Sequence, residues 1–209
     1  MSRRSRRNQP FSVEYVARSK DPDGTDQVLT IRNHTEVSVQ PTLAFTARDI
    51  WGRELPNVTT QAVNGSHRGT PLLPSQGTLT EILRFDGPGH RDVRIVDIAL
   101  ADVQEVDHPA LEADVNVVMI DLDQKAVLDP AEFWGIGIAN PNSFGVTVRI
   151  SLVAFEERER DYPRQPVDVV TLQHDVDVAS QSHEVIWLPE EVRGRFELIA
   201  HHLRPPTYV

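Results

Sequence analysis

The stretch TIRNHTEVSVQPTLAFTARDIWGREL, from Thr30 to Leu55, decides the fold class of this chain. In its middle, apolar side chains recur at every second position with polar side chains between them. This period of two predicts a β-strand with one buried face. The apolar residues are Val37, Val39, Leu43, Phe45 and Ala47. Pro41 falls on the same register, so we expect an edge strand or a bulge there. Asp49 and Gly52 then predict a turn into a returning strand.

A second alternating run appears 107 residues later, and Asn140 stands before it as Asn33 stands before the first. Its apolar residues are Phe144, Val146, Val148, Ile150, Leu152 and Ala154. Two further blocks recur: residues 11–15 resemble 115–119 at an offset of 104, and residues 80–85 resemble 183–188 at an offset of 103. Three blocks in the same order predict an internal duplication. The alternative is two unrelated runs of alternating strands.

Each repeat holds about seven short strand patterns separated by turn signals, which is typical of an immunoglobulin-like sandwich. We therefore predict an all-β chain of two tandem immunoglobulin-like β-sandwiches related by internal duplication. They would occupy residues 11–105 and 110–205, after a flexible basic tail over residues 1–10. Long helical periodicity is missing, and single helical turns are expected only near 108–115 and 129–135.

Composition excludes several classes of protein. The chain has 209 residues, 39% of them hydrophobic and 25% charged, with a net charge of −10 that disfavours a general role in coating nucleic acid. It has no cysteine, which excludes disulfides, thiolate metal sites and a cysteine nucleophile. No apolar run approaches the roughly 18 residues of a transmembrane helix, and no apolar segment follows the N-terminal arginines as in a secretory signal. We expect a cytoplasmic protein without a transmembrane segment.

Turn and core residues of the first repeat resemble the FxLYD and LEA14-like immunoglobulin-like domains. The pattern is a strand entering Asn-x-Thr, an alternating strand with an aromatic residue, then Asp-x-x-Gly and later Pro-x-x-Gly. The matching residues are Asn33, Thr35, Phe45, Asp49, Gly52, Pro74 and Gly77. The second repeat keeps Asn140 but has EERE in place of Asp-x-x-Gly. The resemblance covers about half of each repeat and implies a non-enzymatic interaction or stalk domain.

One loop has a composition that suits a cation. Asp21, Asp23 and Asp26 surround a glycine in the sequence DPDGTD and could offer several oxygen ligands to Ca²⁺. The glutamate that closes a twelve-residue EF-hand loop is missing. The alternative is a polar hairpin turn between two strands.

Motifs for catalysis are missing from the sequence. It contains no Gly-x-Ser-x-Gly, no Ser-x-x-Lys and no phosphate-binding glycine loop, and its eight histidines lack zinc-ligand spacing. We therefore expect a protein that is not an enzyme and has no cofactor.

Two features favour binding. The first is the basic tail with Arg3, Arg4, Arg6 and Arg7, which could dock on an acidic partner, an anionic membrane or nucleic acid, or could serve solubility alone. The second is Trp51, which we expect to be exposed in its turn, whereas Trp187 sits in an alternating strand and is expected in the core. The sequence favours a non-catalytic structural or protein-interaction module with an unidentified protein partner. The alternative is a ligand-binding accessory domain for carbohydrate or Ca²⁺.

Overall fold

The computed structural model describes residues 10–15, 27–129, 132–155, 166–172, 175–196, 201–203 and 207–209. Most of its regular elements are β-strands in antiparallel sheets, which confirms the all-β prediction. Among the described residues α1 (Glu190–Phe196) is the one α-helix, and the helical turn expected near 108–115 does not form. No helix in this part of the chain is long and apolar enough to cross a membrane.

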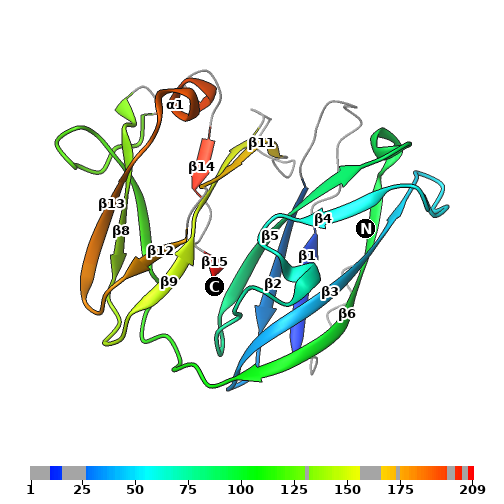
Figure 1. Ribbon diagram of the computed structural model, residues 1–209, viewed down its shortest axis with the longest axis horizontal. Helices are drawn as coiled ribbons and strands as arrows, with labels where there is room; N and C mark the ends of the chain where they lie inside the picture. The colour runs from blue at the N-terminus through cyan, green and yellow to red at the C-terminus, as the bar shows by residue number, and fades with distance from the viewer. Residues whose placement is uncertain are drawn as a thin grey trace.

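The first half of the chain forms two facing layers of strands (Figure 1). Its strands are β1 (Phe11–Tyr15), β2 (Gln27–Asn33), β3 (Ser38–Arg48), β4 (Thr59–Ala62), β5 (Thr78–Asp86) and β6 (Ile95–Val106). One layer is an antiparallel sheet in the order β1-β2-β5-β4, and the other is the long ribbon β3-β6. The ribbon is bulged between Thr42 and Leu43, which confirms the irregularity predicted next to Pro41.

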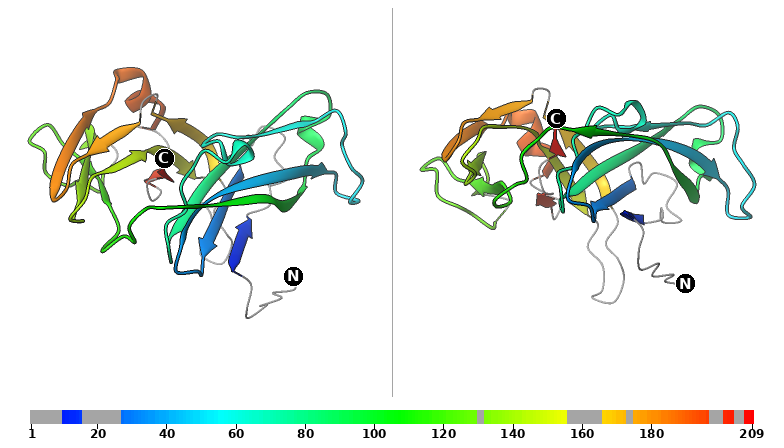
Figure 2. Two further views of the ribbon diagram at one scale, coloured as in Figure 1. Left: turned by 60° about the horizontal axis from the view of Figure 1, so that its bottom comes forward. Right: turned by 90° about the horizontal axis from the view of Figure 1, so that it is seen from below.

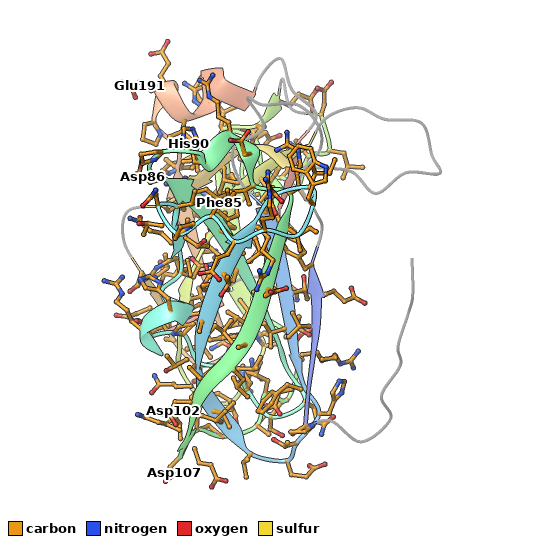
Figure 3. The ribbon with its side chains drawn as sticks, turned by 90° about the vertical axis from the view of Figure 1, so that its right-hand side faces the viewer. Phe85, Asp86, His90, Asp102, Asp107 and Glu191 are labelled. Atoms are coloured by element: carbon orange, nitrogen blue, oxygen red, sulfur yellow. The ribbon has the colours of Figure 1, made fainter. Side chains whose placement is uncertain are left out.

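The β3-β6 ribbon reaches from one end of the first half to the other. Figure 3 shows Phe85 and His90 near one end and Asp102 and Asp107 at the opposite end. The chain passes into the second half just after this second end. The ribbon therefore spans the first half. The turn after β3 lies at one end of it, and the connection between the halves lies at the other.

The second half is also built from antiparallel strands, which are shorter. They are β7 (Asn116–Ile120), β8 (Gly135–Asn140), β9 (Val146–Arg149), β10 (Ser151–Phe155), β11 (Pro166–Thr171), β12 (Val176–Val178), β13 (Ser182–Trp187), β14 (His201–Leu203) and β15 (Thr207–Tyr208). They pair as three sheets in the orders β13-β8-β7, β12-β9-β15 and β11-β10-β14. Between the first two sheets lies a core that includes Ile136, Ile138, Val146 and Val148.

The strand pairing of the two halves matches position by position. Val13 pairs with Ile31 in the first half, and Val117 pairs with Ile138 in the second, at offsets of 104 and 107. The bridge between Val39 and Leu73 likewise has a counterpart in the pair of Val146 and Val178, at offsets of 107 and 105. The later strands thus correspond at an offset of 105, two residues from the 103 that the sequence blocks suggested.

Two asparagines stabilise the matching turns. The Nδ2 of Asn33 donates to the carbonyls of Val37 and Pro74 at 2.8 and 3.0 Å. The Nδ2 of Asn140 donates to the carbonyls of Phe144 and Ala179 at the same two distances. Both asparagines are at most 2% exposed, so these bonds give each buried side-chain amide its hydrogen-bond partners. The asparagine noted in the sequence is therefore a structural residue in each half.

The two halves pack directly against each other. Val28 and Ile82, on the side of the first sheet that faces away from its own core, are buried with Val153 and Val169 of β10 and β11. Polar contacts border this cluster, because Arg84 donates to the Val169 carbonyl at 3.3 Å and Arg149 donates to the Asn64 carbonyl at 3.3 Å. β2 and β5 are therefore buried on both faces, which explains their nearly continuous burial.

The C-terminal strand adds a backbone link between the halves. Leu72 donates its N–H to the carbonyl of Tyr208 at 2.9 Å, while β15 pairs with β9 of the second half. Figure 2 shows the C-terminus between the two halves from two further directions.

Candidate functional site

The turn that follows β3 is organised by one buried carboxylate. Asp49 is 4% exposed, and its Oδ1 accepts the backbone N–H groups of Trp51 and Arg53, each at 2.9 Å. Its Oδ2 accepts the Nε of Arg53 at 2.7 Å. Gly52 adopts φ 80°, a left-handed conformation that glycine takes without strain. Asp49 accepts the hydrogen bonds of the turn and Gly52 adopts its left-handed position without strain, as their spacing predicts.

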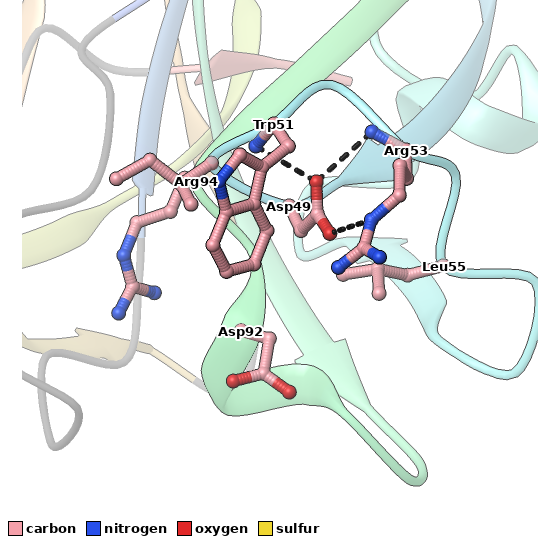
Figure 4. Close-up of a pocket in the computed structure, with 7 residues that line it drawn as sticks. Asp49, Trp51, Arg53, Leu55, Asp92 and Arg94 are labelled. Atoms are coloured by element: carbon pink, nitrogen blue, oxygen red, sulfur yellow. Dashed lines mark hydrogen bonds and ion pairs between the residues drawn. The ribbon is translucent and has the colours of Figure 1, made fainter.

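This turn raises Trp51 out of the surface. The side chain is 76% exposed, which confirms the sequence expectation, and the guanidinium carbon of Arg53 lies 4.8 Å from its ring centroid. Figure 4 shows the indole between Arg94 and the Asp49–Arg53 pair, with Asp92 beyond its far edge. These side chains line a surface hollow of about 470 Å³ together with Ile50 and Leu55. The site therefore offers an aromatic face flanked by cationic and anionic groups.

Two ion pairs lie in and beside the Trp51 turn. Burial raises the pKa of Asp49, but the backbone and guanidinium of Arg53 and the N–H of Trp51 outweigh it and lower that pKa below its usual value. Beside the turn, Arg48 forms an ion pair with Asp97 at 2.5 Å, and this hydrogen bond and charge raise the pKa of Arg48. Arg48 also donates to the Gly52 carbonyl at 3.1 Å. The hydrogen bonds and ion pairs of Asp49 and Arg48 therefore fix the backbone of the turn that carries Trp51.

A second turn with the same hydrogen bonds lies after β7, and sequence reasoning missed it. The Oδ1 of Asp121 accepts the backbone N–H groups of Asp123 and Lys125, each at 2.9 Å. Gln124 takes the place of Gly52 with φ 63°. The missing glycine hid this turn, and the available signal was an Asp four residues before a basic residue. Its tip presents Leu122, which is 61% exposed.

Other residues named from the sequence lie elsewhere. Arg3, Arg4, Arg6 and Arg7 of the basic tail lie outside the described residues, as do the proposed calcium ligands Asp21, Asp23 and Asp26. Within the described ranges no group of three or more His, Asp or Glu side chains could hold a metal ion. Trp187 is 47% exposed, so its prediction as a core residue is wrong.

Of the binding features expected from the sequence, the Trp51 turn is the one that lies within the described residues, and it belongs to the first half. Comparisons with family models, with curated proteins and with solved structures find no match for this chain.

Proposed function

We propose that the chain is a non-catalytic protein-interaction module built from two tandem immunoglobulin-like sandwiches related by internal duplication. The matched strand pairing at offsets of 104, 107 and 105 supports the duplication. The repeated roles of Asn33 and Asn140 support it independently, because they stabilise the same turn in each half.

The interaction role rests on one observation: Trp51 is exposed on a turn that is fixed by hydrogen bonds. A tryptophan that is 76% exposed leaves a large apolar surface in water, which a partner can bury. Tryptophan and arginine are also the side chains that most often dominate the energy of protein interfaces, and Arg53 and Arg94 flank this ring. Because the turn is hydrogen-bonded before binding, little conformational entropy is lost when a partner docks.

A non-catalytic role agrees with how the acids of the hollow are used. Both carboxylate oxygens of Asp49 accept hydrogen bonds within the turn, and its lowered pKa makes it a poor general base. The second acidic residue that lines the hollow is Asp92. We therefore assign binding, and no proton transfer, to this surface.

A carbohydrate is the second candidate ligand, and the size of the hollow favours it. A volume of about 470 Å³ lies within the range of small-molecule sites. The indole face can cover the apolar side of a sugar ring while Asp92 and Arg94 hydrogen-bond its hydroxyls. The calcium alternative rests on Asp21, Asp23 and Asp26 alone and stays a prediction from the sequence.

The test is affinity capture from the lysate of the native host, read by mass spectrometry. Wild type is compared with Trp51→Ala and with Leu128→Ala, a control that removes an apolar side chain 93% exposed. A stoichiometric protein that is lost with Trp51→Ala and kept with Leu128→Ala supports the proposal. A chain lacking residues 1–10 is captured in parallel, and loss of the partner there would assign the contact to the arginine tail.

No specific protein in any arm would contradict the interaction role. A glycan array then decides the second candidate, since signals that disappear with Trp51→Ala would identify a carbohydrate site. Signals that persist with Trp51→Ala would place glycan binding elsewhere.

A further inference from the structure

The sheet β13-β8-β7 has two faces, and the one turned away from the core is also apolar. On the core side, Ile136 and Ile138 of β8 are at most 1% exposed. Because neighbouring residues on a strand point to opposite sides, Gly135, Gly137 and Ala139 face outward. Their cross-strand partners share that face and are Ile120, Val118 and Asn116 on β7 and Trp187, Val185 and His183 on β13. We call these nine residues the outer face.

The outer face has a buried counterpart in the first half. At the offsets of 107 and 105, the pair Val28 and Ile82 corresponds to the pair Gly135 and Trp187. Val28 and Ile82 are 2% and 0% exposed, because Val153 and Val169 of the second half pack on them. In contrast, Trp187 is 47% exposed. The same sheet surface is thus covered in one half and open at Trp187 and Val118 in the other, where Ile120 and Gly135 are buried.

The glycines make the open face shallow. A Cβ on Gly135 would lie 2.9 Å from Cε3 and 3.3 Å from Cζ3 of Trp187, so the six-membered ring of the indole packs on this glycine. A Cβ on Gly137 would lie 3.3 Å from Cγ2 of Val118. Neighbouring side chains therefore lean over the middle strand, and Val118 stays 43% exposed. The result is a low apolar surface that a flat element such as a strand or hairpin can cover.

The first half shows what covers such a face. Val153 and Val169 are paired residues on the antiparallel strands β10 and β11, and both are buried against Val28 and Ile82. Two neighbouring strands of the sheet β11-β10-β14 thus cover the face of β2 and β5 with β-branched side chains. A strand or hairpin that presents such side chains could cover the outer face in the same way. Figure 1 shows β13 and β8 at the left-hand end, on the side away from the first half, where a second molecule can approach.

Charge selects the kind of partner. The segments that border the outer face, residues 116–125 and 182–191, contain the acids Asp121, Asp123, Glu190 and Glu191, while Glu184 pairs with Ile138 and lies on the opposite side of β13. Lys125 is their one basic residue other than histidine, and it lies 3.3 Å from Asp123. A second copy of the chain would bring the same acids and a net charge of −10. A partner with basic side chains would instead be attracted.

We propose that the outer face of β13-β8-β7 is a docking surface for an extended protein segment, a strand or hairpin, that presents β-branched apolar side chains flanked by arginine or lysine. Apolar contact with Val118, Val185 and Trp187 supplies the affinity, and the acidic border selects basic sequences. This surface is separate from the Trp51 hollow and does not depend on the role proposed for it.

The test uses two fluorescein-labelled peptides and the full chain. One peptide is acetyl-Arg-Val-Thr-Val-Arg-Val-Thr-Val-Arg-amide, and the other has glutamate in place of each arginine. Binding is measured by fluorescence anisotropy with wild type, Val118→Lys, Val185→Lys and Leu128→Lys. The last variant makes the same change of charge at an exposed apolar residue outside the outer face. Circular dichroism checks that each variant is folded.

We expect the arginine peptide to bind wild type and the glutamate peptide not to bind. We expect Val118→Lys and Val185→Lys to weaken binding by about tenfold or more, and Leu128→Lys by at most about twofold. Equal weakening by all three would show attraction to negative charge alone and would overturn the proposal, as would no binding of the arginine peptide. Sedimentation that shows dimers abolished by Val118→Lys would assign the face to a second copy instead. Trp51→Ala should bind the peptide as wild type does, so the two proposals fail independently.

Discussion

The backbone N–H of Leu72 donates to the carbonyl of Tyr208 at 2.9 Å, and this bond ties the C-terminal strand to the first half of the chain. The Tyr208 side chain is 5% exposed within the core of the second half, and its hydroxyl accepts the N–H of Val115 at 3.4 Å. One residue near the C-terminus therefore joins the interface to the second core. Together with the valine cluster, it favours two halves that unfold as one unit.

Replacement of Tyr208 tests this link. We expect Tyr208→Phe to lower the free energy of unfolding by about 1 kcal/mol, because the buried Val115 N–H loses its acceptor. We expect Tyr208→Ala to lower it by about 3–5 kcal/mol, because a large side chain leaves a cavity. Urea unfolding followed by tryptophan fluorescence and by circular dichroism measures both. A Tyr208→Ala protein as stable as wild type would contradict the role given to this strand.

The two turn asparagines should be equivalent in energy. We expect Asn33→Ala and Asn140→Ala each to destabilise the fold by about 2–3 kcal/mol, since each removes a buried amide that donates to two carbonyls of the turn and accepts one backbone N–H. Asn57→Ala, at an exposed turn position, is the matched control and should cost less than about 0.5 kcal/mol. Thermal unfolding of the three variants decides the point. A large difference between Asn33→Ala and Asn140→Ala would count against matching turns.

Local signals in the sequence predicted the strands, the bulge near Pro41 and the exposed turn at Trp51, because each depends on neighbouring residues. The packing of the halves depends on residues far apart in the chain, such as Val28 and Val153, and no local pattern shows it. Trp187 illustrates the same limit. Its alternating strand predicts one buried face, but only the strand pairing reveals that Trp187 faces outward over Gly135.

A buried carboxylate in the first half should also be costly to replace. Glu81 is 0% exposed, and it accepts backbone N–H groups from Asn64, Ile82 and Ser66 at 2.7, 2.9 and 3.0 Å. In Glu81→Gln the new amide turns donors toward at least one of these N–H groups, so we expect a loss of about 2–3 kcal/mol. Glu105→Gln on the exposed part of β6 is the control. Equal stability of the two variants, measured in urea, would refute this assignment.

The Trp51 turn should respond to acid. Because the pKa of Asp49 is lower in the folded chain than in the unfolded chain, the ionised carboxylate stabilises the fold. This contribution is complete above the unfolded value of about 3.9 and is lost as pH falls through the lower folded value. We expect the amide resonances of Trp51 and Arg53 to move together only below about pH 4. In Asp49→Asn this titration should vanish, and its persistence would assign it to another group.

Two glycines in the second half should respond to alanine in opposite ways. At Gly135 a Cβ would lie 2.8 Å from the Ile186 carbonyl oxygen and 2.9 Å from the Trp187 ring, so the backbone and the indole must both shift. We expect Gly135→Ala to destabilise the fold by about 1–3 kcal/mol. At Gly194 in α1 no atom lies within 4 Å of the added Cβ. Gly194→Ala should therefore stabilise the fold by about 0.5–1 kcal/mol through helix propensity.

Tryptophan emission should shift in Gly135→Ala and stay unchanged in Gly194→Ala, because Trp187 lies over the first glycine. If Gly135→Ala were neutral in stability and in emission, Trp187 would not be packed on Gly135, and the shallow outer face described above would be wrong.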